Sequence, residues 1–229
     1  MNAPALRFDH SVQAVLFDLD GTLVDTAPDM VGALVRLQTQ RGAAEVNYAA
    51  ARSNVSNGAA GLVRVAFPDA DDLLREELHR DFLAIYQQNL CVESRVFAGL
   101  DTLLDELERA HLPWGVVTNK PQALTDALLV ALGLAQRAAC AISGDTLPQR
   151  KPHPAPLLLA SRMLNVAPER IVYVGDAARD IEAGRAAGMA TVAAAWGYIT
   201  DDDDPAAWAA DHIAASPDEL SQLLTKELR

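Results

Sequence analysis

Five short apolar runs set the strongest limit on what this chain can fold into. They cover residues 12–17, 114–118, 139–143, 171–174 and 191–195, and their β-branched residues are typical of buried strands. Helical patterns at residues 121–134, 154–166 and 180–188 separate the later runs. This alternation predicts βαβ units, and therefore an α/β fold built on a parallel sheet.

The stretch between the first and second runs is far too long for a simple crossover. It spans about ninety residues and carries helical patterns at 30–42, 48–67 and 71–91. We therefore expect an inserted helical cap domain over residues 26–96, with hinges near its two ends. The α/β core domain would then consist of residues 11–25 and 97–229.

Charge and cysteine content exclude several classes of protein. The 229 residues carry a formal net charge of -12, which argues against a general nucleic-acid binder, so an anionic substrate needs a local site. Cys91 and Cys140 are too few for a disulfide framework, and neither a signal-peptide core nor a membrane-length apolar run is visible. These observations predict a cytoplasmic chain without nucleic-acid or membrane partners.

Polar residues follow the predicted strands at the points where they end. Asp18 and Asp20 follow the first strand, Thr118 and Asn119 end the second, and Asp176 follows the fourth. Ligands of open α/β sheets bind at the carboxyl ends of the strands, so one crevice would collect these side chains. Two carboxylates this close repel each other unless a positive group lies between them.

Two simpler explanations of the first acidic pair were weighed. Asp20 and Gly21 form a common turn dipeptide, but a turn leaves Asp18 unexplained. A calcium loop also begins with D-x-D, but Leu23 stands where that loop needs glycine and Asp29 where it needs glutamate. The calcium-loop interpretation is therefore set aside.

Four motifs in order resemble those of the haloacid dehalogenase superfamily: DLDGTLVDT, VVTNK, RKPHPAP and VGDAARD. The similarity extends over about residues 12–220 and includes an insertion where that superfamily carries its helical cap. Within the superfamily the chain is similar to the phosphoglycolate phosphatase group, and Asp20 favours phosphoryl transfer over dehalogenation. The resemblance implies a Rossmann-like core and hydrolysis of a small phosphomonoester that also carries a carboxylate.

The resemblance also implies roles for the acidic residues. Asp18 would be the nucleophile that forms an aspartyl phosphate, and Asp20 would be the general acid and base. Mg²⁺ would be held by Asp18, the backbone carbonyl of Asp20, Asp176 and Asp180, and its positive charge would offset the repulsion between the carboxylates. Asp180 could instead cap a helix, and this alternative stays open here.

Four further residues are expected to contact the phosphoryl group or lie beside it: Thr118, Asn119, Gly21 and Lys151. Lys151 precedes a helix that begins near Pro154, where the helix dipole disfavours a cation unless an anion is shared. We therefore expect its removal to weaken phosphate binding with little loss of fold stability. An ordinary exposed lysine is the alternative.

The cap is expected to select the substrate, because the core contacts only the phosphoryl group that all substrates share. Ser56, Asn57 and Gly58 form a polar break between helical stretches and are the candidate substrate-binding residues of the cap. An ordinary loop between helices explains the same three residues equally well. Cap closure would also exclude water during transfer.

The substrate itself is less constrained by the sequence. Two segments resemble N-acetylmuramic acid 6-phosphate phosphatases more specifically than the phosphoglycolate phosphatase group as a whole: WGVVTNKP and GYITDDDDPAAWAAD. Near the start of the second segment, Trp196 and Tyr198 could pack on a sugar ring or simply close the core. We expect a cavity roomy enough for an amino-sugar phosphate rather than only for phosphoglycolate. A phosphosugar mutase or another sugar or nucleotide phosphatase is the alternative, and the oligomeric state is left open.

Overall fold

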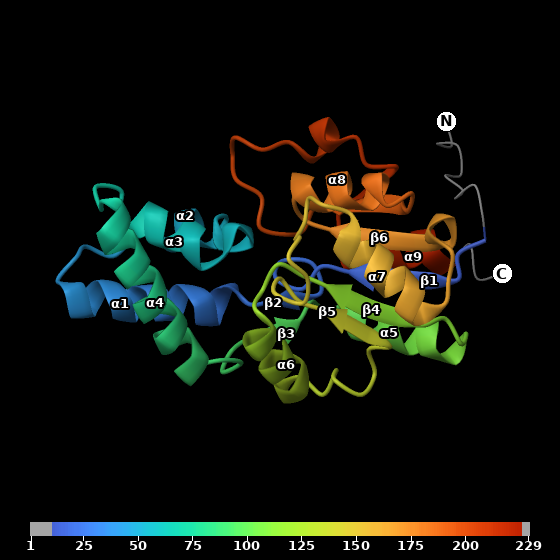
Figure 1. Cartoon of the computed structure of the whole chain (residues 1–229), viewed down its shortest axis with the longest axis horizontal. Helices are drawn as coiled ribbons and strands as arrows, with labels where there is room; N and C mark the ends of the chain where they lie inside the picture. Colours follow the sequence, from blue (N-terminus) through green and yellow to red (C-terminus); the bar gives the residue numbers. More distant parts are fainter. Residues whose placement is uncertain (1–10, 226–229) are drawn as a thin grey trace.

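A six-stranded parallel sheet forms the centre of the computed structural model, which describes residues 11–225 (Figure 1). Its strand order is β5-β4-β1-β6-β7-β8, and every neighbouring pair is parallel. The strands are β1 (Ala14–Phe17), β4 (Trp114–Val117), β5 (Cys140–Ile142), β6 (Ile171–Gly175), β7 (Ala190–Ala194) and β8 (His212–Ala214). The expected α/β fold with a parallel sheet is confirmed.

Helices cover both faces of this sheet because its strands are apolar on both sides. In β1, Val15 and Phe17 pack into one core cluster while Ala14 and Leu16 pack into another, as the two-residue period of a strand requires. The first cluster includes residues of α5 (Leu100–Arg109), α6 (Gln122–Ala131) and α9 (Pro217–Thr225); the second includes α7 (Ala155–Leu164) and α8 (Ala178–Ala186). The core is therefore a three-layer sandwich.

Four helices form a second body at one end of the sheet, and we call them the cap helices (Figure 1). They are α1 (Ala27–Arg41), α2 (Tyr48–Arg52), α3 (Gly58–Ala66) and α4 (Asp72–Gln88), with the short 3-10 turn η1 (Val55–Asn57) between α2 and α3. They enclose a separate apolar cluster that includes Leu34, Leu62, Phe82 and Tyr86. The chain enters this body through β2 (Val24–Asp25) and leaves through β3 (Arg95–Val96), which pair antiparallel. The assignment of residues 26–96 as an independent domain stays a prediction.

Several elements differ from the sequence-based expectation. The helical pattern expected over 48–67 is divided because Gly58 adopts a positive φ of 66°, which ends η1 and starts α3. The strands β2, β3 and β8 and the helices α5 and α9 were not expected. Two short 3-10 turns, η2 (Pro168–Arg170) and η3 (Pro205–Trp208), complete the described chain. None of the helices in residues 11–225 is long and apolar enough to span a bilayer.

Candidate active site

Asp18 lies directly after β1, in a loop that backbone hydrogen bonds hold in place. The amides of Leu23 and Val24 both donate to the carbonyl of Leu19, at 3.1 and 2.9 Å. Gly21 has a φ of 85°, and a Cβ there would lie 2.1 Å from Asp176 Oδ2, so only glycine fits. Gly21 therefore lets the loop approach Asp176, and it is not among the residues that line the cavity.

Asp176 lies in the turn between β6 and α8, and Asp180 lies in the first turn of α8. Together with Asp18 they place carboxylate oxygens within 4.8 Å of one another, and all three side chains are buried. Asp180 also accepts a hydrogen bond from the amide of Ala177, at 3.1 Å. The two roles considered for Asp180 are therefore compatible: it caps α8 and belongs to the acidic cluster.

The cluster has a deficit of positive charge. Burial, reinforced by the charges of Asp18 and Asp180, raises the pKa of Asp176 to about 7 from its ordinary value of 3.8. Burial raises the pKa of Asp180 as well, although Lys151 opposes this. Oxygen ligands packed this closely in a buried site suit a hard divalent cation such as Mg²⁺, because the cation would hold them ionised.

Lys151 supplies the nearest positive charge of the protein itself. Its ammonium group lies 2.9 Å from Asp18 Oδ1 and 2.7 Å from Asp180 Oδ1, and it donates to the carbonyl of Val117 and the hydroxyl of Tyr173. The side chain is only 2% exposed. Lys151 therefore lies beneath the carboxylates, which excludes the alternative of an ordinary exposed lysine, and its buried ion pairs lead us to expect a larger loss of stability on its removal than the sequence suggested.

Thr118 and Asn119 follow β4 and line the same cavity, but their side chains do different things. The Thr118 hydroxyl accepts a hydrogen bond from the amide of Lys120 at 3.2 Å, so its own proton is available to an incoming oxygen. The side-chain amide of Asn119 binds the backbone of Lys151: its Nδ2 donates to the Lys151 carbonyl, and its Oδ1 accepts from the Lys151 backbone N–H, both at 3.0 Å. Asn119 thus holds Lys151 in place.

Lys120 is a site residue that the sequence interpretation missed. Its ammonium group lies 2.9 Å from Asp20 Oδ1 and 3.1 Å from the hydroxyl of Tyr86 on α4. Burial alone would lower the pKa of Lys120, but Asp20 and Tyr86 raise it above the usual value, so the side chain is charged. Thr26 donates a second hydrogen bond to Asp20, at 2.6 Å. Lys120 lies within the VVTNK motif, but nothing in the sequence indicates that Tyr86 would meet it.

The three candidate residues of the cap lie around η1 and line the cavity. Ser56 bridges cap and core, because its hydroxyl donates to Asp176 Oδ2 at 2.6 Å and its carbonyl accepts from Arg179. Asn57 is exposed and its amide donates to Asn54, while Gly58 begins α3. Ser56 thus contacts a candidate metal ligand, a role that the sequence did not suggest.

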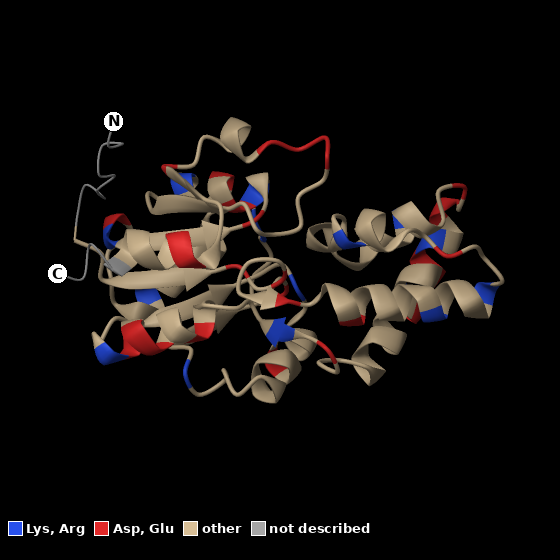
Figure 2. Cartoon of the chain, turned by 180° about the vertical axis from the view of Figure 1, so that it is seen from behind, with Lys and Arg blue, Asp and Glu red and all other residues tan. Residues whose placement is uncertain are grey.

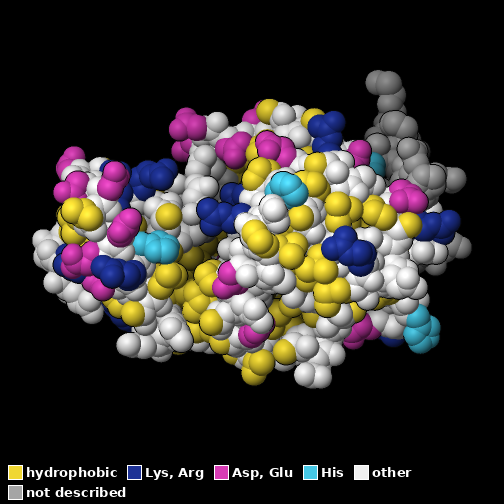
Figure 3. Space-filling view, in the orientation of Figure 1, with side chains coloured by type: hydrophobic (Ala, Val, Ile, Leu, Met, Phe, Trp, Pro, Cys, Tyr) yellow, Lys and Arg dark blue, Asp and Glu magenta, His cyan; other side chains and the backbone are white. Residues whose placement is uncertain are grey.

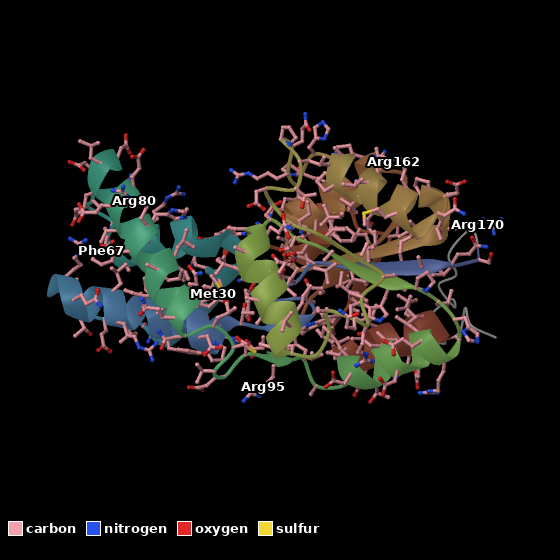
Figure 4. All side chains as sticks on the ribbon, turned by 60° about the horizontal axis from the view of Figure 1, so that its bottom comes forward. Met30, Phe67, Arg80, Arg95, Arg162 and Arg170 are labelled. Atoms are coloured by element: carbon pink, nitrogen blue, oxygen red, sulfur yellow. The ribbon has the colours of Figure 1, made fainter. Side chains whose placement is uncertain are left out.

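A cavity of about 540 Å³ lies between the cap helices and the carboxyl ends of the strands. Figure 3 shows this hollow from outside, and Figure 2 shows acidic and basic segments meeting where the sheet faces the cap helices. Asp18, Asp20 and Thr118 belong to its polar wall, and Met30, Phe82 and Tyr86 to its apolar wall. In Figure 4, Met30 lies at the inner end of α1, whereas Arg80 points outward from α4.

Trp196 and Tyr198 do not line this cavity. Tyr198 is buried in the apolar cluster of the cap helices, where its hydroxyl donates to Asp25 at 2.7 Å and accepts from the amide of Ala27. Trp196 donates its indole N–H to the carbonyl of Thr22. The alternative in which these rings close the core is therefore the correct one, and Phe82 and Tyr86 are the aromatic residues of the cavity.

Comparison with known proteins agrees with this geometry. The model of the haloacid dehalogenase-like hydrolase family matches residues 15–194. A phosphoglycolate phosphatase of Xanthomonas campestris pv. campestris (strain 8004) is 47% identical over 208 residues, covering 91% of this chain and 94% of the relative. An N-acetylmuramic acid 6-phosphate phosphatase of Pseudomonas aeruginosa is 42% identical over 218 residues, covering 95% and 96%.

Solved structures share the fold as well. The crystal structure of a predicted phosphoglycolate phosphatase from Haemophilus somnus 129PT superimposes with a TM-score of 0.83 at 27% identity, covering 94% of this chain and 99% of that one. These matches confirm the expected fold and the expected class of phosphoric monoester hydrolase. The chain belongs to the haloacid dehalogenase-like hydrolase family.

Proposed function

We propose that this protein is a Mg²⁺-dependent phosphomonoester phosphatase that works through an aspartyl phosphate. The observation that carries the proposal is the convergence of Asp18, Asp176 and Asp180 on one buried point, with Asp20 two residues after Asp18 in the same cavity. Nucleophile, acid–base group and metal ligands are thereby within reach of one bound phosphate.

The residues divide the chemistry between them. The Asp18 carboxylate attacks phosphorus in line, and Asp20 protonates the leaving alkoxide and later takes a proton from the attacking water. Thr118 donates its hydroxyl proton to a phosphoryl oxygen, and Lys151 holds Asp18 in position through their 2.9 Å ion pair. The metal would be held by Asp18, the backbone carbonyl of Asp20, Asp176 and Asp180. When bound, Mg²⁺ neutralises charge between the nucleophile and the phosphoryl group.

The cavity favours a substrate larger than phosphoglycolate. About 540 Å³ lies in the range of 300–1,000 Å³ that is typical of sites for drug-sized ligands, which a two-carbon acid would leave mostly filled with water. The apolar wall offers Phe82 and Tyr86 to the body of a sugar ring. We therefore propose an amino-sugar phosphate, such as N-acetylmuramic acid 6-phosphate, as the preferred substrate in the cytoplasm.

One experiment tests the mechanism and a second tests the substrate. Asp18→Asn should lower phosphate release by about a thousandfold or more in Mg²⁺ buffer, since an amide is a poor nucleophile. Full activity of this variant would overturn the mechanism. The ratio of kcat/KM for N-acetylmuramic acid 6-phosphate to that for 2-phosphoglycolate should exceed one, and a strong preference for the smaller acid would refute the sugar assignment.

A further inference from the structure

Two side chains that can carry positive charge line the cavity without serving the acidic cluster. Arg150 comes from the loop before Lys151, and His79 comes from α4 of the cap. Neither side chain makes an ion pair or hydrogen bond with any residue in the described range 11–225. Figure 3 shows Lys or Arg side chains on the core side of the hollow and a histidine on its cap side.

The other cations of the cavity are already committed. Lys151 is spent on Asp18 and Asp180, Lys120 on Asp20, and Arg179 donates to the carbonyl of Ser56. Arg150 is exposed, although it is the chain neighbour of the buried Lys151. In a protein with a net charge of -12, an unpaired arginine on a cavity wall is available to a ligand.

We infer that Arg150, with His79 on the cap side of the same cavity, binds a second anionic group of the substrate, a carboxylate that the phosphoryl site does not reach. This inference rests on the proposed phosphatase function and names the residues that would recognise the carboxylate of its candidate substrates. The planar guanidinium group of Arg150 presents paired N–H donors that match the two oxygens of a carboxylate. The imidazole of His79 can donate one further hydrogen bond.

A matched pair of substrates isolates this contact. N-acetylglucosamine 6-phosphate has the sugar, acetamido group and phosphate of N-acetylmuramic acid 6-phosphate but lacks its lactyl ether, and therefore its carboxylate. Arg150→Gln should raise KM for the carboxylate-bearing sugar about tenfold, with little change in kcat, and leave KM for the analogue without a carboxylate within twofold. His79→Gln should also raise the KM for the carboxylate-bearing sugar relative to the KM for the analogue without a carboxylate, but by a smaller factor.

Matched controls are available on the same elements or nearby. Arg162 is an exposed arginine on α7 that does not line the cavity, and Arg80 follows His79 on α4 but points outward (Figure 4). Arg162→Gln and Arg80→Gln should leave both KM values at those of the unmodified protein. Because Arg150 is exposed, its replacement should not impair folding, and thermal unfolding checks this.

The outcome separates failure of this inference from failure of the proposed function. An equal rise of KM for both sugars, or no rise for either, would overturn the role of Arg150 in carboxylate binding. Calorimetric binding of the two sugars to Asp18→Asn, with and without Arg150→Gln, gives the same comparison without turnover. Absence of phosphate release from every ester in Mg²⁺ would overturn the phosphatase proposal, while the binding comparison would still decide the carboxylate site.

Discussion

Replacing Asp176 with asparagine should stabilise the metal-free protein near neutral pH. Asp176 is 1% exposed, and its pKa is raised from 3.8 to about 7 by burial and by the charges of Asp18 and Asp180. The folded protein therefore keeps a proton that the unfolded chain releases between these two pH values. Stability falls as pH rises wherever the folded state binds more protons, so this group costs stability as pH rises toward 7.

The magnitude follows from the shift. A rise of about three pKa units corresponds to about 4 kcal/mol of unfolding free energy, which is fully present below about pH 4 and is lost as the pH rises to about 7. Asparagine keeps acceptor oxygen for Ser56 and the amide of Tyr198 but cannot ionise. The unfolding free energy of Asp176→Asn should therefore exceed that of the unmodified protein, by an amount that grows from near zero at pH 4 to about 4 kcal/mol at pH 8.

Urea unfolding in EDTA at several values between pH 5 and pH 8 measures this difference. Asp126→Asn, which removes an exposed carboxylate of α6, is the control and should follow the unmodified protein. Added Mg²⁺ should narrow the difference at pH 8, because a ligand at a hundred times its Kd stabilises the folded state by about 2.7 kcal/mol, which offsets most of the gap of about 4 kcal/mol. A difference that does not change with pH, or a variant less stable at pH 8, would refute the reasoning.

Two further substitutions test the lysines. Lys151→Ala should cost about 3–5 kcal/mol of unfolding free energy in urea, because it leaves two buried carboxylates without their cation; a loss below about 1 kcal/mol would contradict the buried ion pairs. Lys120→Met should lower kcat for an alkyl phosphate about tenfold or more, because Asp20 loses the ammonium group that positions it. Tyr86→Phe should have a smaller effect, and unchanged kcat in Lys120→Met would show that Asp20 is held by other contacts.

The sequence predicted the sheet well because its strands are buried on both faces. Continuous apolar runs such as 171–174 are easy to recognise, because they lack the alternation of apolar and polar residues that marks an amphipathic helix. β8 was not predicted because it is a three-residue edge strand whose central Ile213 is exposed. α5 could have been recognised, since Leu100, Leu103, Leu104 and Leu107 recur at helical spacing and are all buried.

The candidate site was predictable only as far as its motifs fix positions along the chain. The strand ends bring Asp18 and Asp176 together in any fold of this topology. The partners of Lys120 and Ser56 depend on how the cap helices meet the core, and that packing leaves no local pattern in the sequence. The position of Lys151 was misjudged because the helix dipole was weighed without the two carboxylates that bind its ammonium group.

The pairing of β2 with β3 has a consequence for how such proteins diversify. The chain leaves the core at Val24 and returns at Val96, and these two residues are paired neighbours in one small antiparallel ladder. A segment whose ends are already adjacent can lengthen, shorten or be exchanged at little cost in loop closure, since that cost grows only with the logarithm of length. Recombination at β2 and β3 would replace the cap residues that line the cavity while leaving Asp18, Asp176 and Asp180 of the core unchanged.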